Sequence, residues 1–266
     1  IQRRIVSQSE ELDACDAKDD DRRKADLISA NLYRLHKGDT EAVLEDFYEP
    51  DCPTIHIALD VRLTPPQNAQ KYYQAYKKAC TAEKILTEQI AKGREELAYL
   101  DSVLDALSRA ESENDLEQLR AELAEQGYLR LLRRKGKPPK CLPPMEFTAS
   151  DGTRILVGRN NAQNDRLTLK TARGRDVWFH VKNAPGSHAV VLSGGQPVPD
   201  TTKTEAAVLA AVHSSQNGGA KVQVDYTEVR NVWKANGAKP GMVLYDPYET
   251  AVVTPDPALA ERLRAK

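Results

Sequence analysis

The chain has 266 residues, of which 40% are hydrophobic and 29% are charged, and its formal net charge is −1 at pH 7. This length allows two ordinary domains or one large one, and the composition excludes both an embedded membrane protein and a wholly disordered chain. No apolar run approaches the roughly 20 residues that span a bilayer, and Arg3 and Arg4 lead into a helical pattern rather than a signal peptide. We therefore expect a cytoplasmic protein with no membrane partner, and the start at Ile1 suggests a fragment of a longer protein.

The near-neutral net charge conceals an uneven distribution. Residues 141–266 hold 15 Lys and Arg against 12 Asp and Glu, whereas residues 1–140 hold 23 against 27. The most basic segment, residues 130–140, contains no acidic residue, which is typical of a nucleic-acid contact or of a solvated linker. The cysteines lie far apart with no Cys-x-x-Cys pair, so reduced thiols are favoured over a zinc site or a disulfide framework.

Residues 1–37 have apolar positions at helical spacing, and Gly38 can cap the end of that segment. Residues 39–64 differ, because Ile55, Ile57 and Leu59 alternate with polar or small residues and predict a strand. Residues 43–48 can form its partner strand across a turn-rich connection.

A long helix is predicted from Thr64, where Thr64 can act as the cap and Gln67 can complete a capping box. A heptad pattern follows through Leu86, Ile90, Gly93, Leu97, Leu100, Leu104 and Leu107. We interpret residues 1–128 as an antiparallel helical coiled-coil arm with a small β insertion at its tip, about residues 39–64. Dimerisation of two chains through the same seam is the alternative.

A basic, proline-rich linker is predicted at residues 129–144, followed by a second domain at residues 145–266. Its pattern predicts one helix, residues 202–213, among short strands at residues 155–157, 167–171, 177–182, 189–192, 222–226, 242–245 and 251–253. The fold class is therefore α+β: a coiled-coil arm followed by a mixed α+β domain.

The segment from Gly158 to Asp165 is rich in amide side chains, next to Arg159. Asn and Asp favour tight turns, so a polar hairpin is one interpretation. The other is that the same amides contact bases or phosphates.

On the strand at residues 177–182, Trp178, His180 and Lys182 share one face, opposite an apolar core face. An aromatic ring beside a cation is suited to stacking on an unpaired base and to neutralising its phosphate. The alternative is that Trp178 covers a second layer of core, because Trp is mostly buried in folded proteins.

Catalytic motifs are absent from the sequence. It contains no Gly-x-Ser-x-Gly, no phosphate-binding Gly-x-x-x-x-Gly-Lys and no His-Glu-x-x-His. We expect no catalytic residue, no metal and no cofactor, and we keep a metal-dependent hydrolase that uses Asp165 and His180 as the weakest alternative.

The motifs in residues 146–253 resemble the NFACT-R domain of the NFACT family, including Pro185-Gly-Ser-His188, Val224-Asp-Tyr226 and Ala238-Lys-Pro-Gly241. Residues 1–127 resemble the coiled-coil arm of that family. The chain departs from the family pattern at Trp233-Lys234-Ala235, where Lys-Lys-Pro is usual.

This resemblance implies a ribosome-associated quality-control factor that binds the large ribosomal subunit, recruits tRNA and supports C-terminal alanine tailing of stalled chains. The ribosome would form the peptide bonds, so the factor is expected not to be an enzyme. By this resemblance, we expect the amino-terminal NFACT-N domain and the helix–hairpin–helix module of the family to be missing from this chain. An older family name, fibronectin-binding protein, supplies the alternative of a surface adhesin.

From the residues and the resemblance together, we expect a set of amide, aromatic, histidine and basic side chains to contact nucleic acid. These are Arg159, Asn160, Asn161, Asn164, Asp165, Lys170, Trp178, His180, Lys182, Ser187, His188, Lys221, Tyr226, Lys234 and Lys239.

Overall fold

The computed structural model describes residues 1–130 and 142–265 of the chain. The described residues form two compact units, Ile1–Glu95 and Glu96–Lys266, and the long helix α3 (Pro65–Ser108) contributes to both. Most of the predicted linker, with its basic run, lies outside the described residues. No helix of the described chain is both long enough and apolar enough to cross a membrane.

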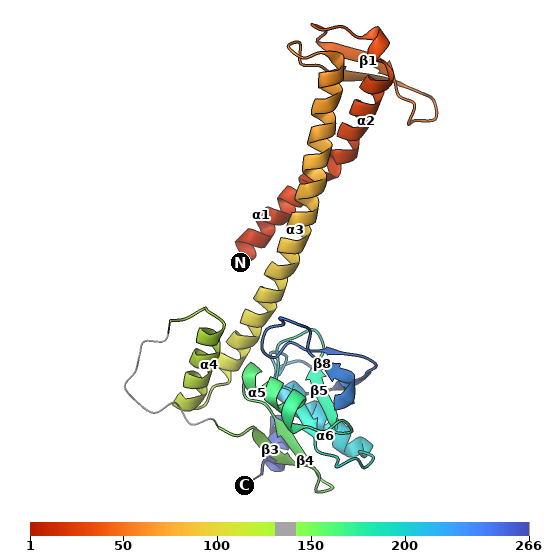
Figure 1. The fold of residues 1–266 in the computed structure, drawn as a ribbon. Helices are drawn as coiled ribbons and strands as arrows, with labels where there is room; N and C mark the ends of the chain where they lie inside the picture. Colours follow the sequence, from red (N-terminus) through yellow and green to blue (C-terminus); the bar gives the residue numbers. More distant parts are fainter. Residues whose placement is uncertain (131–141, 266) are drawn as a thin grey trace. The chain divides into compact units, whose positions relative to one another are not determined.

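The first unit contains an antiparallel helical arm. Helices α1 (Gln2–Asp13) and α2 (Lys18–Ala30), joined by a short 3-10 turn, run alongside α3 (Figure 1). The Gln8 amide donates to Gln89 at 2.5 Å and Lys18 pairs with Glu83 at 2.8 Å, so residue numbers rise on one helix as they fall on the other. The predicted antiparallel arm is confirmed, and its seam pairs helices of the same chain. Association of two arms stays a prediction.

The small β insertion is an antiparallel pair, β1 (Glu41–Glu45) and β2 (Thr54–Ala58). Its buried face carries Ala42, Leu44 and Ile57, which pack with residues of α2 and with Ala69 of α3. The start of α3 follows the predicted pattern, because the Thr64 N–H donates to the Gln67 side chain at 2.9 Å.

The heptad prediction holds only for the first part of α3. Leu86 and Ile90 are buried, but Leu104 and Leu107 are 63% and 48% exposed. Within the second unit, the buried hydrophobic positions of α3 are Tyr99, Val103 and Ala106, which pack on Leu119 of α4 (Glu113–Glu125). The seam prediction beyond Gly93 is therefore wrong by one residue, or about 100° around the helix, because α3 meets a different partner in the second unit.

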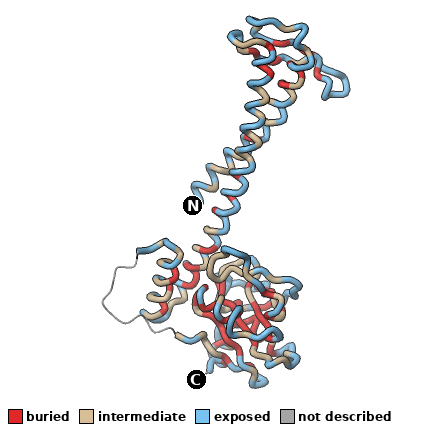
Figure 2. The backbone as a smooth tube through the Cα atoms, viewed as in Figure 1, coloured by how far each residue is buried: buried red, intermediate tan, exposed pale blue. Residues whose placement is uncertain are grey.

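The second unit is built on a six-stranded sheet of order β10-β7-β5-β6-β4-β3. Each of its neighbouring strands pairs in the antiparallel sense. The strands are β3 (Met145–Thr148), β4 (Arg154–Val157), β5 (Val177–Val181), β6 (Ala189–Val191), β7 (Val222–Glu228) and β10 (Glu249–Val253). Helices α6 (Asp200–Val212) and α7 (Pro257–Leu263) pack on one face of the sheet and contribute to the main core. Figure 2 shows that buried residues are concentrated in this unit. The predicted α+β class is confirmed.

Sequence analysis predicts one helix in residues 145–266 of this unit, which is wrong because α5 and α7 accompany α6. Two segments also have another structure than the predicted one. The amide-rich segment forms the short helix α5 (Asn161–Arg166) instead of a hairpin, and residues Leu167–Thr171 form a π-helical turn instead of a strand. The physical reason is a helix cap, because the Asn160 side chain accepts a hydrogen bond from the Gln163 N–H at 2.9 Å.

The opposite face of the sheet carries a second core, which explains the position of Trp178. Trp178 packs there with Leu156, Leu167 and Val190, and with residues of the segment that leads into the short pair β8 (Val232–Trp233) and β9 (Leu244–Tyr245). The sheet is thus covered on both faces at β5.

Candidate nucleic-acid interface

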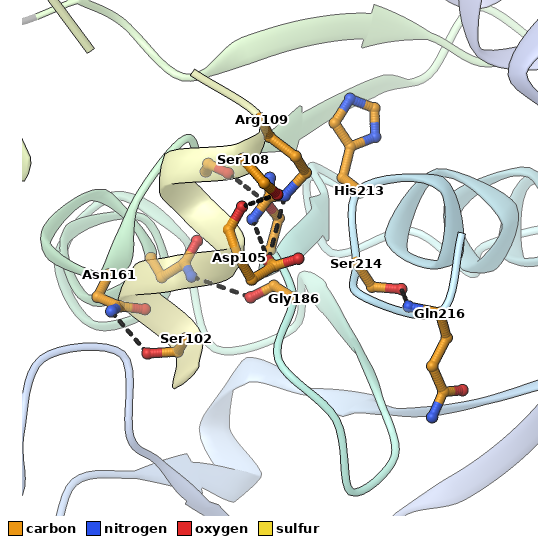
Figure 3. Close-up of polar contacts among 12 residues, drawn as sticks. Ser102, Asp105, Ser108, Arg109, Asn161, Gly186, His213, Ser214 and Gln216 are labelled. Atoms are coloured by element: carbon orange, nitrogen blue, oxygen red, sulfur yellow. Dashed lines mark hydrogen bonds and ion pairs between the residues drawn. The ribbon is translucent and has the colours of Figure 1, made fainter. Parts of the chain in front are cut away.

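The amide side chains of α5 lie buried against the helices α3 and α4. The Asn161 side chain donates to the Ser102 hydroxyl at 2.8 Å (Figure 3). It also donates to the Glu122 carboxylate at 3.2 Å. Asn160 donates to Gln118 of α4 at 3.0 Å, and Asn164 accepts from the His188 N–H at 3.1 Å. These amides already have partners inside the protein, so the structure assigns them to the contact between helices rather than to an exposed RNA surface.

Arg109, the residue directly after α3, extends this contact to the turn before β6. Its guanidinium binds the Asp105 carboxylate through two nitrogens, at 2.6 and 3.1 Å, and donates to the Ser187 hydroxyl at 3.0 Å (Figure 3). Ser187 in turn donates to the carbonyl of Gly158 at 2.5 Å. Ser187 and His188 are both 1% exposed, so neither presents the surface that we expected from the sequence.

Two carboxylates of this contact are buried. Glu122 accepts hydrogen bonds from the Tyr99 hydroxyl at 3.0 Å and from the Ala162 N–H at 3.2 Å, in addition to Asn161. Burial raises the pKa of the Glu122 carboxyl, and it also raises the pKa of Asp105 against the opposing effect of Arg109. The network therefore places two carboxyls with raised pKa values at the junction of three helices.

Trp178 is fully buried, so the exposed stacking surface predicted for it is wrong. It belongs to a cluster of rings: His180 lies parallel to it at 5.7 Å, while His188 and Tyr245 approach it at 5.2 and 4.8 Å between ring centroids. Burial lowers the pKa of His180 to about 4 and lowers that of His188 well below its ordinary value, so both imidazoles are neutral at pH 7.

Several of the predicted basic contacts are engaged within the chain. Lys234 pairs with Asp165, and Lys182 lies 3.5 Å from the Asp225 carboxylate and 4.9 Å from the centre of the Tyr248 ring. The Lys239 ammonium lies over Tyr99 and Tyr128, at 5.6 and 5.1 Å from the ring centres. The side chain of Arg159 donates to the carbonyl of Pro143 at 3.2 Å. By contrast, Lys170 and Lys221 are exposed.

A groove of about 400 Å³ gathers a different set of cations and rings, and we call it the tyrosine groove. Its basic side chains are Arg175, Lys203 and Arg230, and its rings are Tyr226 and Tyr248. The Lys203 ammonium lies 5.9 Å from the centre of the Tyr226 ring, and Arg230 is paired with Glu228 at 2.7 Å. Cations beside ring faces are suited to a single-stranded nucleic acid, and Glu228 and Glu249 on the same walls limit the net positive charge.

The groove has five basic and aromatic residues. Of these, only Tyr226 is among the nucleic-acid contacts that we expect from the sequence. Arg175 lies in the turn before β5 and Lys203 on α6, more than twenty positions apart in the sequence. One local feature of the sequence could have indicated this basic site, namely the two closely spaced arginines Arg173 and Arg175, both of which are exposed. Their proximity to Arg230 follows from the fold, because the Arg230 N–H donates to the carbonyl of Gly174 at 3.0 Å.

The described residues contain no group of three or more His, Cys, Asp or Glu side chains that could hold a metal ion. Asp165, which the hydrolase alternative requires, accepts a hydrogen bond from the Gly241 N–H at 3.0 Å with one oxygen and pairs with Lys234 through the other. Its arrangement is that of a structural carboxylate.

Comparison with known proteins supplies the family. Residues 1–141, more than half of the chain, match the family model of the NFACT N-terminal and middle domains. The chain belongs to the NFACT family. Residues 144–246 match the NFACT protein RNA binding domain. This range includes most of the tyrosine groove, whereas Tyr248 and Glu249 of the groove follow it. The resemblance seen in the sequence is thereby confirmed.

Two relatives of this NFACT chain carry the name Rqc2 homolog RqcH. The protein from Bacillus subtilis (strain 168) is 43% identical over 234 residues, and the one from Streptococcus pneumoniae serotype 2 (strain D39 / NCTC 7466) is 41% identical over 254 residues. These alignments cover 87% and 95% of this chain but only 40% and 45% of the relatives. The chain thus spans less than half the length of the curated relatives it matches.

A solved structure is similar over nearly the whole chain. It is the C-terminal part of the fibronectin/fibrinogen-binding protein from Streptococcus suis, with a TM-score of 0.78 and 34% identity. The similarity covers 99% of this chain and 92% of that one. The fold described above is therefore shared with an NFACT relative.

Proposed function

We propose that this NFACT chain supplies the arm and the RNA-binding part of a ribosome-associated quality-control factor. In this proposal it binds the large ribosomal subunit and tRNA in the cytoplasm, and it supports C-terminal alanine tailing of stalled nascent chains. It acts as a binder, because the ribosome carries out the peptide-bond chemistry.

The observation that carries the proposal is the match of residues 144–246 to an RNA-binding domain, most of whose tyrosine groove lies in those residues, with Tyr248 just beyond them. The relatives named Rqc2 homolog RqcH support the quality-control role. Within the domain, the contacts that we propose are Arg175, Lys203, Arg230, Tyr226 and Tyr248, with the exposed Lys170 and Lys221 at the periphery.

Co-sedimentation with purified large ribosomal subunits tests this proposal. Subunits carrying a peptidyl-tRNA should retain the chain at low salt, and retention should fall steeply as salt increases, because phosphate contacts release counterions. Absence of retention at micromolar protein and low salt contradicts the proposal.

The alternative function, a surface adhesin, is favoured by one observation, the name of the similar Streptococcus suis protein. Fractionation of cells separates the two functions. Full-length protein on the surface of intact cells, together with its absence from ribosome fractions, supports the adhesin and contradicts the ribosomal role.

A further inference from the structure

A second cleft, of about 540 Å³, lies within the unit Glu96–Lys266 and differs in chemistry from the tyrosine groove. Its walls include Asp101 and Ser102 of α3, Trp178 and His180 of β5, and Met242 and Tyr245. Its volume is in the range of small-molecule sites, which is about 300–1,000 Å³.

The lining of this cleft excludes a phosphate as its ligand. Among the described residues that line it there is no Lys or Arg, whereas Asp101 contributes a carboxylate. The imidazoles of His180 and His188, which also line it, are neutral at pH 7 because burial lowers their pKa. The cleft therefore suits a flat, uncharged group that has hydrogen-bond donors of its own.

Trp178, one of the residues around the cleft, has an unsatisfied polar atom. The Trp178 Nε1–H is buried and has no hydrogen-bond acceptor among the described residues, which is a rare and costly arrangement in folded proteins. The indole itself has no exposed surface, whereas residue His180, whose ring stacks on it at 5.7 Å, is half-buried. A ligand in the cleft therefore meets the imidazole of His180 first, with the indole behind it.

The cleft and the tyrosine groove are neighbours. Tyr245 lines the cleft and Tyr248 lines the groove, and their rings are in edge-to-face contact at 5.2 Å. An RNA strand whose phosphates lie along the cations of the groove can thus place a base in the cleft across this pair of tyrosines.

We propose that the cleft takes one unpaired nucleobase of a bound RNA strand, stacked on His180 and facing Asp101 and Ser102. This inference rests on the proposed RNA-binding function and adds a base-binding site to it. Proteins that bind single strands combine an electrostatic track for the backbone with aromatic rings for the bases, and the two neighbouring sites divide those tasks.

The test uses fluorescence anisotropy with the 266-residue chain and 12-nucleotide single-stranded RNAs. One set consists of oligoadenylate and oligouridylate, and the other is a ribose-phosphate strand of the same length without bases. We expect the wild-type chain to bind at least one base-containing RNA about 10-fold more tightly than the abasic strand, as expected from stacking of one base.

The decisive variant is Ala98→Phe, which fills the cleft from an exposed position on α3. It should lower the affinity for the base-containing RNA to that of the abasic strand and leave abasic binding unchanged. The matched control is Ala91→Phe, which makes the same change at an exposed site of the same helix outside the cleft and should change neither affinity.

A second variant, His180→Leu, removes the stacking ring and keeps apolar volume, and it should also remove the preference for bases. Equal affinity of the wild type for base-containing and abasic strands overturns the base site and leaves RNA binding standing. Unchanged base preference in both cleft variants overturns it as well. A wild-type chain that binds neither RNA contradicts the proposed function itself, and the base site with it.

Discussion

The guanidinium of Arg109 reaches the hydroxyl of Ser187 at 3.0 Å, across 78 positions of the sequence. This bond fixes the end of α3 to the turn that leads into β6, and Asp105 holds the same guanidinium from one turn earlier. The NFACT RNA-binding domain and the end of the arm helix therefore share one polar network within the second unit.

Removal of Arg109 should destabilise this unit strongly. Arg109→Met leaves the Asp105 carboxylate buried without its cation, which costs about 3 kcal/mol of the free energy of unfolding. Urea titration measures the effect. Arg120→Met, which breaks an exposed ion pair with Glu117, is the control and should change the stability by less than about 1 kcal/mol. Equal effects of the two variants contradict the structural role of Arg109.

The buried carboxyl of Glu122 should make stability depend on pH. Its pKa is raised in the folded state, so the folded protein holds this proton more tightly than the unfolded chain does. The contribution of Glu122 to stability is therefore most favourable below the unfolded pKa and is lost as pH rises through the folded pKa.

Glu122→Gln removes this titration. The difference in the free energy of unfolding between wild type and variant, measured by urea titration from acidic to neutral pH, should shift in favour of the variant as pH rises. A shift in favour of the wild type over the same range contradicts the raised pKa.

Substitution of Trp178 should reduce the stability of the fold, because the side chain is buried in the second core and not exposed to RNA. Trp178→Ala removes a fully buried indole from the second core and should lower the free energy of unfolding by about 3–5 kcal/mol. Trp233, the other tryptophan, is 47% exposed, and Trp233→Ala should cost less than about 1 kcal/mol. Thermal unfolding of the two variants compares them directly, and similar midpoints contradict the burial of Trp178.

The shift of the α3 seam can be tested with two adjacent residues. Val103 is 7% exposed and Leu104 is 63% exposed. Val103→Ala should destabilise the chain by about 2 kcal/mol, whereas Leu104→Ala should change it by less than about 0.5 kcal/mol. The reverse order in chemical denaturation supports the heptad register predicted from the sequence.

The tyrosine groove should contribute to the salt dependence of RNA binding. Arg175→Gln removes one exposed cation, and each phosphate contact on a single strand contributes about 0.7 to the slope of log affinity against log salt. Filter binding to single-stranded RNA should show a shallower slope by about that amount. Arg262→Gln, at an exposed position of α7, is the charge-matched control, and an equal decrease in both variants contradicts a local site.

Part of this fold could be predicted because local patterns determine it. The alternation at Ile55 and Ile57 specifies β2, and Thr64 with Gln67 specifies the start of α3, since each signal lies within a few residues of the structure it forms. The antiparallel arm followed by an α+β domain was predicted in the same way.

The candidate site could not be predicted equally well. The Asn and Asp residues at 160–165 are equally compatible with a hairpin, a helix cap and an RNA-binding surface. Only the packing of α3 and α4 against this segment shows that it forms a buried helix cap.

The sequence by itself determined the elements of the arm and five of the six strands of the main sheet, because these depend on residue order over short ranges, but not the edge strand β3. Its motifs also indicated the membership in the NFACT family. The tertiary structure alone decided which side chains are accessible. It buried Trp178 and Ser187, engaged Lys234 with Asp165, and brought Arg175 next to Arg230. The physical reason is that accessibility depends on which distant segments cover a residue, and period-2 alternation cannot show whether the second face of a strand meets water or another layer of core.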